Sequence, residues 1–446
     1  FNSETNESIA FANIYFPQLE KGTTSTLEGA FSINNLPSGN YKILISYIGF
    51  ETYSATINLP VQEPLLISLN PSAIEMEEII ISTPFHKLQS ENVMKVEQRK
   101  VSDLNERGAI NLSEGITNIP GVDGVSTGIS ISKHVIRGLS SNRVLVYTQG
   151  IRFENQQFGD EHGLGLSDAG IESVEVIKGP ASLLYGSDAL GGVLYLNPER
   201  FAQQNMSATQ LKTKYFSNTE GLSTNIGYKT SGEYFKFLIR GSLAEHSDYN
   251  TKDYRVTNTR FNEKDLKAGL GYHKLNFKTE LRYNLNASKL GIPEEIGIQS
   301  LSKSPLLPYQ DITTHIFSSK SKLFFENSNI EFNLGFTYND RKEFEEEHHH
   351  EEEHEDEEEP DVLFPALHMK LKTFNYDIKY HLPKLGKFET IVGVQGMHQK
   401  NSNYGEEELI PKATTKDFGI LTTSHIQLEK VDVQLGILFD NCLLYT

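Results

Sequence analysis

The chain lacks tryptophan, holds a single cysteine, Cys442, and contains no long run of apolar residues. One cysteine excludes an internal disulfide, so the redox compartment stays open. With a mean hydropathy of −0.40, the absence of an apolar run of about 20 residues excludes a transmembrane helix. It does not exclude a transmembrane β-barrel, because alternating strands give only a weak hydropathy signal.

The charge and the motif content exclude further classes of function. The formal net charge is −18, and residues 343–359 hold twelve acidic residues without a single Lys or Arg. Because no basic face balances this field, nucleic acid is not expected as a partner. The sequence shows no nucleophile–base arrangement and no phosphate-binding loop, so we expect neither an enzyme nor a catalytic cofactor.

Long alternating strands begin at about residue 204. Between 275 and 285, and again between 330 and 339, apolar side chains alternate with polar or charged ones. Period two with one apolar and one charged face is typical of a wall between lipid and a polar lumen. Strands of about ten or more residues favour a membrane barrel over a soluble sandwich, and Tyr and Phe are plentiful enough for its aromatic girdles. We count about eleven such strands.

The links between these strands alternate in length. Tight turns are expected near 230–233, 273–276, 326–329, 383–387 and 428–431, and longer links at 246–262, 288–312, 343–364 and 401–414. Outer-membrane barrels have short periplasmic turns and long extracellular loops, so 343–364 is expected outside the cell. A plugged transporter barrel has about 22 strands, so the chain is expected to supply half of one and to be incomplete.

Two sequence motifs occur at a separation that is informative about the fold. Around Val174 a strand runs into Gly179-Pro180, then Tyr185-Gly186, and a double glycine precedes the next strand. Upstream lie Ile136-Arg137-Gly138 and Gly150-Ile151-Arg152, with a β-prone run between them.

Together these motifs closely resemble the plug domain of TonB-dependent outer-membrane receptors, which usually have Asp-Gly where this chain has Gln149-Gly150. The resemblance implies an α/β plug over 91–200 and the N-terminal half of an outer-membrane barrel over 201–446. It also implies a monomer in the outer membrane of a Gram-negative bacterium, in contact with its lipid.

The N-terminal residues carry a second resemblance. Residues 1–70 read as short strands punctuated by turns, and 28–31, 36–41 and 46–50 resemble the carboxypeptidase-regulatory-like β-sandwich, with its first strand missing. The expected fold is therefore mainly β: a small N-terminal β-sandwich, an α/β plug domain and an incomplete antiparallel transmembrane β-barrel.

Residues 71–90 are predicted to be a linker that contains a short β-prone run bounded by acids and by Pro84. The run consists of Glu77, Glu78, Ile79, Ile80, Ile81, Ser82 and Thr83. An exposed strand of this kind suits pairing with the sheet edge of a partner. It is similar to the TonB box, which implies binding of the energy-transducing TonB complex of the inner membrane.

A histidine–acid loop is the first candidate metal site. Its four histidines, set among carboxylates, are His348, His349, His350 and His354. Neutral imidazole and carboxylate are ligands for Zn²⁺, and imidazole also binds copper and nickel. The alternative is a solvated charge run without a ligand. We favour a flexible loop that collects metal ions.

The plug supplies the second candidate, Asp160, Glu161 and His162, between the two plug motifs. Zinc-uptake receptors of the resembled family carry an Asp–His pair in this outward loop, although Glu161 intervenes here. The alternative is a polar loop that touches an organic ligand or nothing. His398 is the best spare ligand, and Arg137, Arg143 and Arg152 are expected to tie plug to barrel.

These observations predict active uptake of a transition metal, with zinc as the transported ligand. One alternative keeps the fold and imports a siderophore, haem or another metal chelate. An alternative of another class is a metal-sequestering surface barrel or adhesin without transport.

Overall fold

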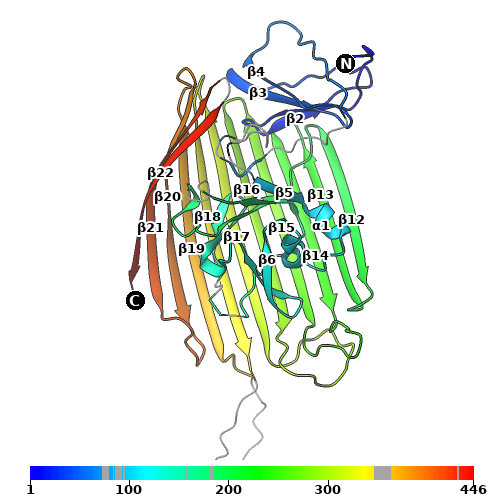
Figure 1. Ribbon diagram of the computed structural model, residues 1–446, viewed down its shortest axis with the longest axis vertical. Coiled ribbons are helices and arrows are strands. Elements are labelled where there is room, and N and C mark those ends of the chain that lie inside the picture. The colour runs from blue at the N-terminus through cyan, green and yellow to red at the C-terminus, as the bar shows by residue number, and fades with distance from the viewer. Residues whose placement is uncertain are drawn as a thin grey trace, which may run out of the picture.

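In the computed structural model, the chain folds as one large curved sheet, a smaller α/β unit in its hollow and a small β unit at one end (Figure 1). The structure describes residues 1–445 except 73–79, 84, 86–92, 94–95, 156–157, 160, 180–183, 346–362 and 429–430. Among the described helices, none is long and apolar enough to cross a membrane.

The large sheet is an antiparallel meander in which each strand pairs with its neighbours in sequence. Its eleven strands are β12 (Met206–Phe216), β13 (Gly221–Ser231), β14 (Phe235–His246), β15 (Phe261–Lys274), β16 (Phe277–Gly291), β17 (Tyr309–Phe324), β18 (Asn329–Phe344), β19 (Leu367–His381), β20 (Phe388–Asn403), β21 (Ala413–Gln427) and β22 (Asp432–Tyr445). The number and length of the strands confirm the sequence-based expectation of a long-stranded barrel wall.

Strict alternation along each strand separates two faces. On β18, Glu331, Asn333 and Arg341 are buried on the concave side, whereas Phe332 and Phe336 are exposed on the convex side. Side chains at i and i+2 share a face, so the period-two pattern places one set of side chains of each strand in the lumen and the alternate set outside.

Turn length alternates between the two ends of the wall, as predicted. Strands β17 and β18 are joined by four residues, 325–328, whereas 345–366 separate β18 from β19. The N-terminal unit lies at the tight-turn end (Figure 1). Asn35 of that unit donates to Glu233 in the turn between β13 and β14, at 3.1 Å.

The plug is a mixed sheet with two short helices. Its strands, in spatial order, are β5 (Val96–Lys100), β10 (Ile171–Ile177), β11 (Gly192–Pro198), β8 (Val144–Thr148) and β9 (Ile151–Phe153), and β6 (Asp123–Thr127) pairs with β7 (Ile131–Val135). Helix α1 spans Val101–Glu106 and α2 spans Leu112–Thr117. The Asn111 side chain caps α2 by accepting from the Glu114 amide, and Leu112 and Ile116 bury its apolar face.

Glycines allow close approaches at one point within the plug and at one point where the wall meets the plug. In the double-glycine motif Gly192 has φ +153°, and a Cβ there would lie 2.7 Å from the Ile177 carbonyl oxygen. In the wall, a Cβ on Gly335 would collide with Ile151 of β9. Gly335 therefore lets the plug sheet lie directly against β18.

The N-terminal unit is a four-stranded sheet ordered β2 (Lys21–Thr24), β1 (Asn13–Phe16), β3 (Gly39–Ser46) and β4 (Tyr53–Leu59). Its apolar core extends to the barrel, because Phe324 of β17 packs in an edge-on contact with Tyr41 at a ring separation of 6.3 Å. The unit is thus docked on the wall through buried apolar surface.

Candidate functional sites

His162 of the plug meets the barrel at the long-loop end. Its side chain is only 2% exposed, and Nε2 lies 2.7 Å from Oε1 of Glu343, near the end of β18. Nδ1 accepts a hydrogen bond from the Gly159 amide at 3.2 Å. A neutral ring that accepts at Nδ1 carries its proton at Nε2, the nitrogen that faces Glu343.

Further contacts hold this pair between plug and wall. The guanidinium of Arg341 lies 3.6 Å from Glu343 and donates to Gln310 of β17 at 2.8 Å. The Gln310 amide in turn donates to the Glu161 carbonyl at 3.0 Å. The plug loop is therefore fixed against two barrel strands.

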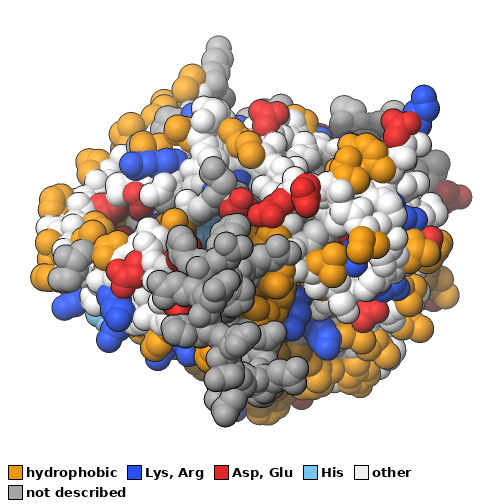
Figure 2. Space-filling model, turned by 90° about the horizontal axis from the view of Figure 1, so that it is seen from below, with side chains coloured by type: hydrophobic (Ala, Val, Ile, Leu, Met, Phe, Trp, Pro, Cys, Tyr) orange, Lys and Arg blue, Asp and Glu red, His pale blue; other side chains and the backbone are white. Residues whose placement is uncertain are grey.

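Carboxylates gather next to the pair. Glu345 follows the end of β18, and burial raises its pKa, with further upward contributions from Glu407, Glu343, Glu294 and Glu161. These side chains come from the plug and three segments at the long-loop end. Figure 2 views the molecule from this end and shows acidic side chains near its middle. The arrangement favours cations at the mouth of the lumen.

The predicted ligands divide into those the structure describes and those it does not. His162 and Glu161 are placed as above, whereas Asp160, His348, His349, His350 and His354 lie outside the described residues. Over the described part of the chain, no group of three or more His, Cys, Asp or Glu side chains forms a metal-binding cluster. Sequence reasoning missed Glu343, because a glutamate at the head of an acidic run carries no distinguishing signal.

The segment predicted to pair with a partner is described only over 80–83 and lies against the plug. Ile80 is 1% exposed and packs with Val96 and Val193, and Ser82 and Thr83 are also buried. These residues form bends rather than a strand, so the expected exposed strand is absent from 80–83. Residues 77–79 lie outside the described part.

A buried carboxylate holds this segment. Glu175 of β10, 0% exposed, accepts from the amides of Ile81 at 3.1 Å and Ser82 at 2.8 Å. Asn197 also donates to it at 2.7 Å. Burial raises the pKa of Glu175, and these hydrogen bonds oppose the shift. The Tyr185 hydroxyl donates to the Ser82 carbonyl, so both polarities of the backbone are satisfied.

Two other expectations have different outcomes. Arg152 ties the plug together through Glu154 at 2.5 Å and Asp188 at 3.1 Å and lies 4.0 Å from Asp417 of β21, as expected for a plug–barrel link. His398 was expected as a spare ligand and that was wrong, because it is exposed on the convex face of β20. Whether a side chain on a strand faces the lumen depends on its odd or even position, and not on how near it lies to the outer end of the strand.

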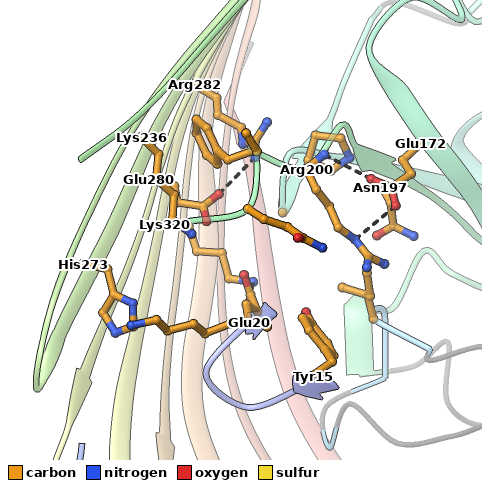
Figure 3. Close-up of a pocket in the computed structure, with 18 of the residues that line it drawn as sticks. Tyr15, Glu20, Glu172, Asn197, Arg200, Lys236, His273, Glu280, Arg282 and Lys320 are labelled. Carbon is orange, nitrogen blue, oxygen red and sulfur yellow. Dashed lines mark hydrogen bonds and ion pairs between the residues drawn. The ribbon is translucent and has the colours of Figure 1, made fainter. Parts of the chain in front are cut away.

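A chamber of about 230 Å³ lies at the opposite end, between the N-terminal unit, the plug and the wall. Figure 3 shows its charged side chains in pairs, Arg200 with Glu172 and Arg282 with Glu280, both at 3.1 Å. Glu20 reaches in from the N-terminal unit and bonds Lys320 at 2.9 Å. Burial, with a smaller contribution from Glu20, raises the pKa of Tyr15 to about 12. Arg200, Arg282 and Lys320 of the chamber lining are thus each paired with a carboxylate.

Two family descriptions match the chain. Residues 89–193 match the TonB-dependent Receptor Plug Domain, and residues 1–81 match the CarboxypepD_reg-like domain. Both matches agree with the resemblances carried by the sequence motifs.

Several curated proteins are similar to parts of the chain. The Iron-regulated outer membrane virulence protein of Vibrio cholerae is 31% identical over 192 residues, which cover 41% of this chain and 28% of that protein. The Vitamin B12 transporter BtuB of Vibrio vulnificus is 32% identical over 124 residues, 26% of this chain and 20% of that one. The Heme/hemopexin utilization protein C of Haemophilus influenzae is 38% identical over 99 residues, 22% and 14% of the two chains.

Solved structures show the same fold. The chain superposes on the Copper transporter OprC with a TM-score of 0.63 at 14% identity, covering 78% of this chain and 56% of that one. The Ferric-Catecholate import receptor Fiu from E. coli K12 gives a TM-score of 0.62 at 14% identity, with coverages of 81% and 62%. The chain thus spans less than two thirds of the length of these structures.

Proposed function

The chain belongs to the TonB-dependent receptors of the Gram-negative outer membrane, and on this premise we propose that the receptor imports a transition metal ion, with zinc as the cargo. In this proposal the His–acid loop gathers ions outside, the plug receives them at His162, and no covalent chemistry takes place.

One observation carries the proposal: Nε2 of His162 lies 2.7 Å from the Glu343 carboxylate, two residues before Glu345 and the His-rich run. Imidazole and carboxylate are zinc ligands at about 2.0–2.2 Å, and a tetrahedral ion between them needs a nitrogen–oxygen separation of about 3.4 Å. A small outward shift of Glu343 and loss of the Nε2 proton would admit the ion. Asp160, Glu161 and the loop histidines are the proposed remaining ligands.

Energy coupling is the second part of the proposal. Residues 80–83 would leave the plug, and the run 77–83 would pair with the TonB complex, because a short β-prone segment before the plug suits strand addition. The amides of Ile81 and Ser82, which Glu175 now accepts, would become free for that pairing.

A metal chelate is the competing cargo. The relatives named for iron regulation, vitamin B12 and haem favour it, whereas the Copper transporter OprC favours a metal ion. A chelate would contact aromatic and Arg side chains and leave the His-rich loop without a role.

The full-length receptor separates these possibilities. Zinc titration by calorimetry should show one tight event that His162→Ala and Glu343→Gln each abolish, and cells carrying either variant should lose zinc uptake. Binding should also weaken in acid, because protons compete with the metal for imidazole. The matched control is Glu331→Gln, on the same face of β18 at its opposite end.

The contrary outcomes are equally specific. If the variants take up zinc normally but lose uptake of a ferric siderophore or haem, the cargo is a metal chelate. Zinc binding without any uptake would establish the sequestering surface barrel.

A further inference from the structure

The chamber between the N-terminal unit, the plug and the wall holds three basic side chains outside its ion pairs. They are Lys21 of β2, Lys236 of β14 and His273 of β15. Lys236 and His273 belong to the lumen face of the wall, and Figure 3 shows both on the wall side of the chamber. Elements far apart in the sequence therefore bring three basic nitrogen atoms to one cavity.

The carboxylates of the chamber are engaged with other groups. Four of them line it, in the contacts Glu20–Lys278, Glu20–Lys320, Glu280–Lys278, Glu280–Arg282, Glu172–Arg200 and Glu233–Asn35. Within the described part of the chain, Lys21 and Lys236 have no carboxylate at ion-pair distance. The chamber thus keeps positive charge without a direct partner, although the whole chain carries a net charge of −18.

Burial makes this charge costly. Lys21 is 8% exposed, and its ammonium group donates to the carbonyl oxygens of Asn34 at 2.5 Å and Asn35 at 3.4 Å. Burial, followed by repulsion from Lys236, lowers the pKa of Lys21 to about 8, with an opposing contribution from Glu233. An anion between two ammonium groups that share a buried space removes this repulsion.

His273 adds a hydrogen-bonding atom that the protein does not use. Its side chain is 5% exposed, and among the described residues its Nε2 atom is buried without a hydrogen-bond partner. A buried polar atom of this kind is costly unless a ligand or a water molecule bonds it. Lys236 lies beside it in the sheet, because Lys236 pairs with Gly271, two residues before His273.

We propose that this part of the chamber binds the phosphate group of a small solute, held by Lys21, Lys236 and Nε2 of His273. Lysine ammonium groups are point-charge ligands of phosphate. Hydrogen phosphate carries two negative charges for two ammonium groups. It also has both a hydroxyl and acceptor oxygens, so it satisfies Nε2 in either tautomer of the ring. A carboxylate has one charge and no donor, and a chamber of about 230 Å³ has room for a larger group.

A phosphate bound here bridges two parts of the molecule. Lys21 belongs to the N-terminal unit, whereas Lys236 and His273 belong to the wall. Because the complete site exists only when the unit is docked, the ligand stabilises the docked arrangement by mass action. This effect does not depend on the identity of the transported cargo.

The test uses the full-length receptor in non-ionic detergent, with inorganic phosphate as the probe and calorimetry as the readout. Lys236→Gln and Lys21→Gln each remove a charged hydrogen bond and should weaken phosphate binding about tenfold or more. Lys236→Arg keeps the charge and should retain binding. Saturating phosphate should slow hydrogen exchange in β2 of the unaltered receptor and leave it unchanged in Lys236→Gln.

Lys274→Gln is the matched control, since Lys274 follows His273 but is exposed on the convex face, 5.8 Å from the Tyr234 ring. This variant should bind phosphate as the unaltered receptor does. Glycerol phosphate separates the two sources of the ligand: tighter binding than inorganic phosphate identifies a phosphate monoester, and weaker binding identifies free phosphate.

Three results would overturn the proposal. They are unchanged phosphate affinity in Lys236→Gln, an equal loss of affinity in Lys274→Gln, and binding of acetate as tight as that of phosphate. Hydrogen exchange in strands away from the chamber checks that each variant is folded.

Discussion

The role that can be assigned to His162 depends on its partner, Glu343. Alone, a histidine in a glycine-rich loop is as consistent with a polar apical loop as with a ligand. Its 2% exposure and the carboxylate at 2.7 Å make it a group held in place by the barrel. The paired Glu343 could be identified only after β18 had been placed beside the plug loop.

His134 is the opposite case, a buried histidine with a structural role. Burial lowers its pKa from 6.5 to about 4, despite the hydrogen bond at 3.0 Å from Nε2 to the Ser113 carbonyl, which favours the charged form. Between pH 4 and pH 6.5, the His134 position binds more protons in the unfolded plug than in the folded plug. The contribution of His134 to the free energy of unfolding should therefore be fully present above pH 6.5 and fall by about 3 kcal/mol as the pH drops to 4.

Hydrogen exchange of the plug in the full-length receptor, at labelling times matched for pH, measures this fall. His134→Gln keeps a donor for Ser113 and cannot titrate, so its plug should respond much less to acid. An identical acid response in both proteins would assign the effect to other groups.

Among the elements, the segment 80–83 depends most on one side chain. In Glu175→Gln the amide oxygen still accepts, but the site loses one acceptor oxygen for the Ile81 and Ser82 amides. Leaving a buried donor unsatisfied costs about 1–3 kcal/mol. We therefore expect faster limited proteolysis of the linker 71–95 in the full-length receptor.

The matched control for this prediction is Glu172→Gln, on the same strand but partly exposed and paired with Arg200. Cleavage at the unaltered rate in Glu175→Gln would show that burial of Ile80, rather than the carboxylate, holds the segment.

The loop between β18 and β19 tests the orientation of the wall. An epitope inserted within 346–362 should bind antibody on intact cells, because long loops of such barrels face outward. The same epitope inserted in the 382–387 turn should bind only after the outer membrane is opened. The reverse pattern would invert the barrel and remove the collecting role of the loop.

At the scale of the whole molecule, the N-terminal unit is fastened over the tight-turn end. Glu20 bonds Lys278 at 2.5 Å and Lys320 at 2.9 Å, from a backbone with φ +47°. A non-glycine residue seldom adopts that conformation, so the ion pairs compensate a local cost.

Removing this charge should loosen the docking. Glu20 is only partly buried, at 23% exposure, but it holds two ion pairs across the contact, so Glu20→Gln should raise hydrogen exchange in β1, β2 and the facing part of β17. Glu28→Gln, an exposed change on the same unit, should leave exchange unaltered. Equal exchange in both variants would mean that the Tyr41–Phe324 packing alone fixes the unit.

The sequence by itself determined the architecture, because that depends on local rules. Period-two patterning sets the two faces of every strand, link length sets the two ends of the wall, and the glycines of the plug motif meet steric demands such as that at Gly192. Of the three arginines expected to tie plug to barrel, Arg152 lies 4.0 Å from Asp417 of β21, whereas Arg143 pairs with Asp188 within the plug.

Only the tertiary structure decided which residues meet. Glu343 with His162, Glu175 with the Ile81 and Ser82 amides, and Glu20 with Lys278 join positions 93 to 258 residues apart, and nothing local marks those partners. Such contacts depend on how strands stack and how the plug sits in the lumen, which a linear pattern does not encode.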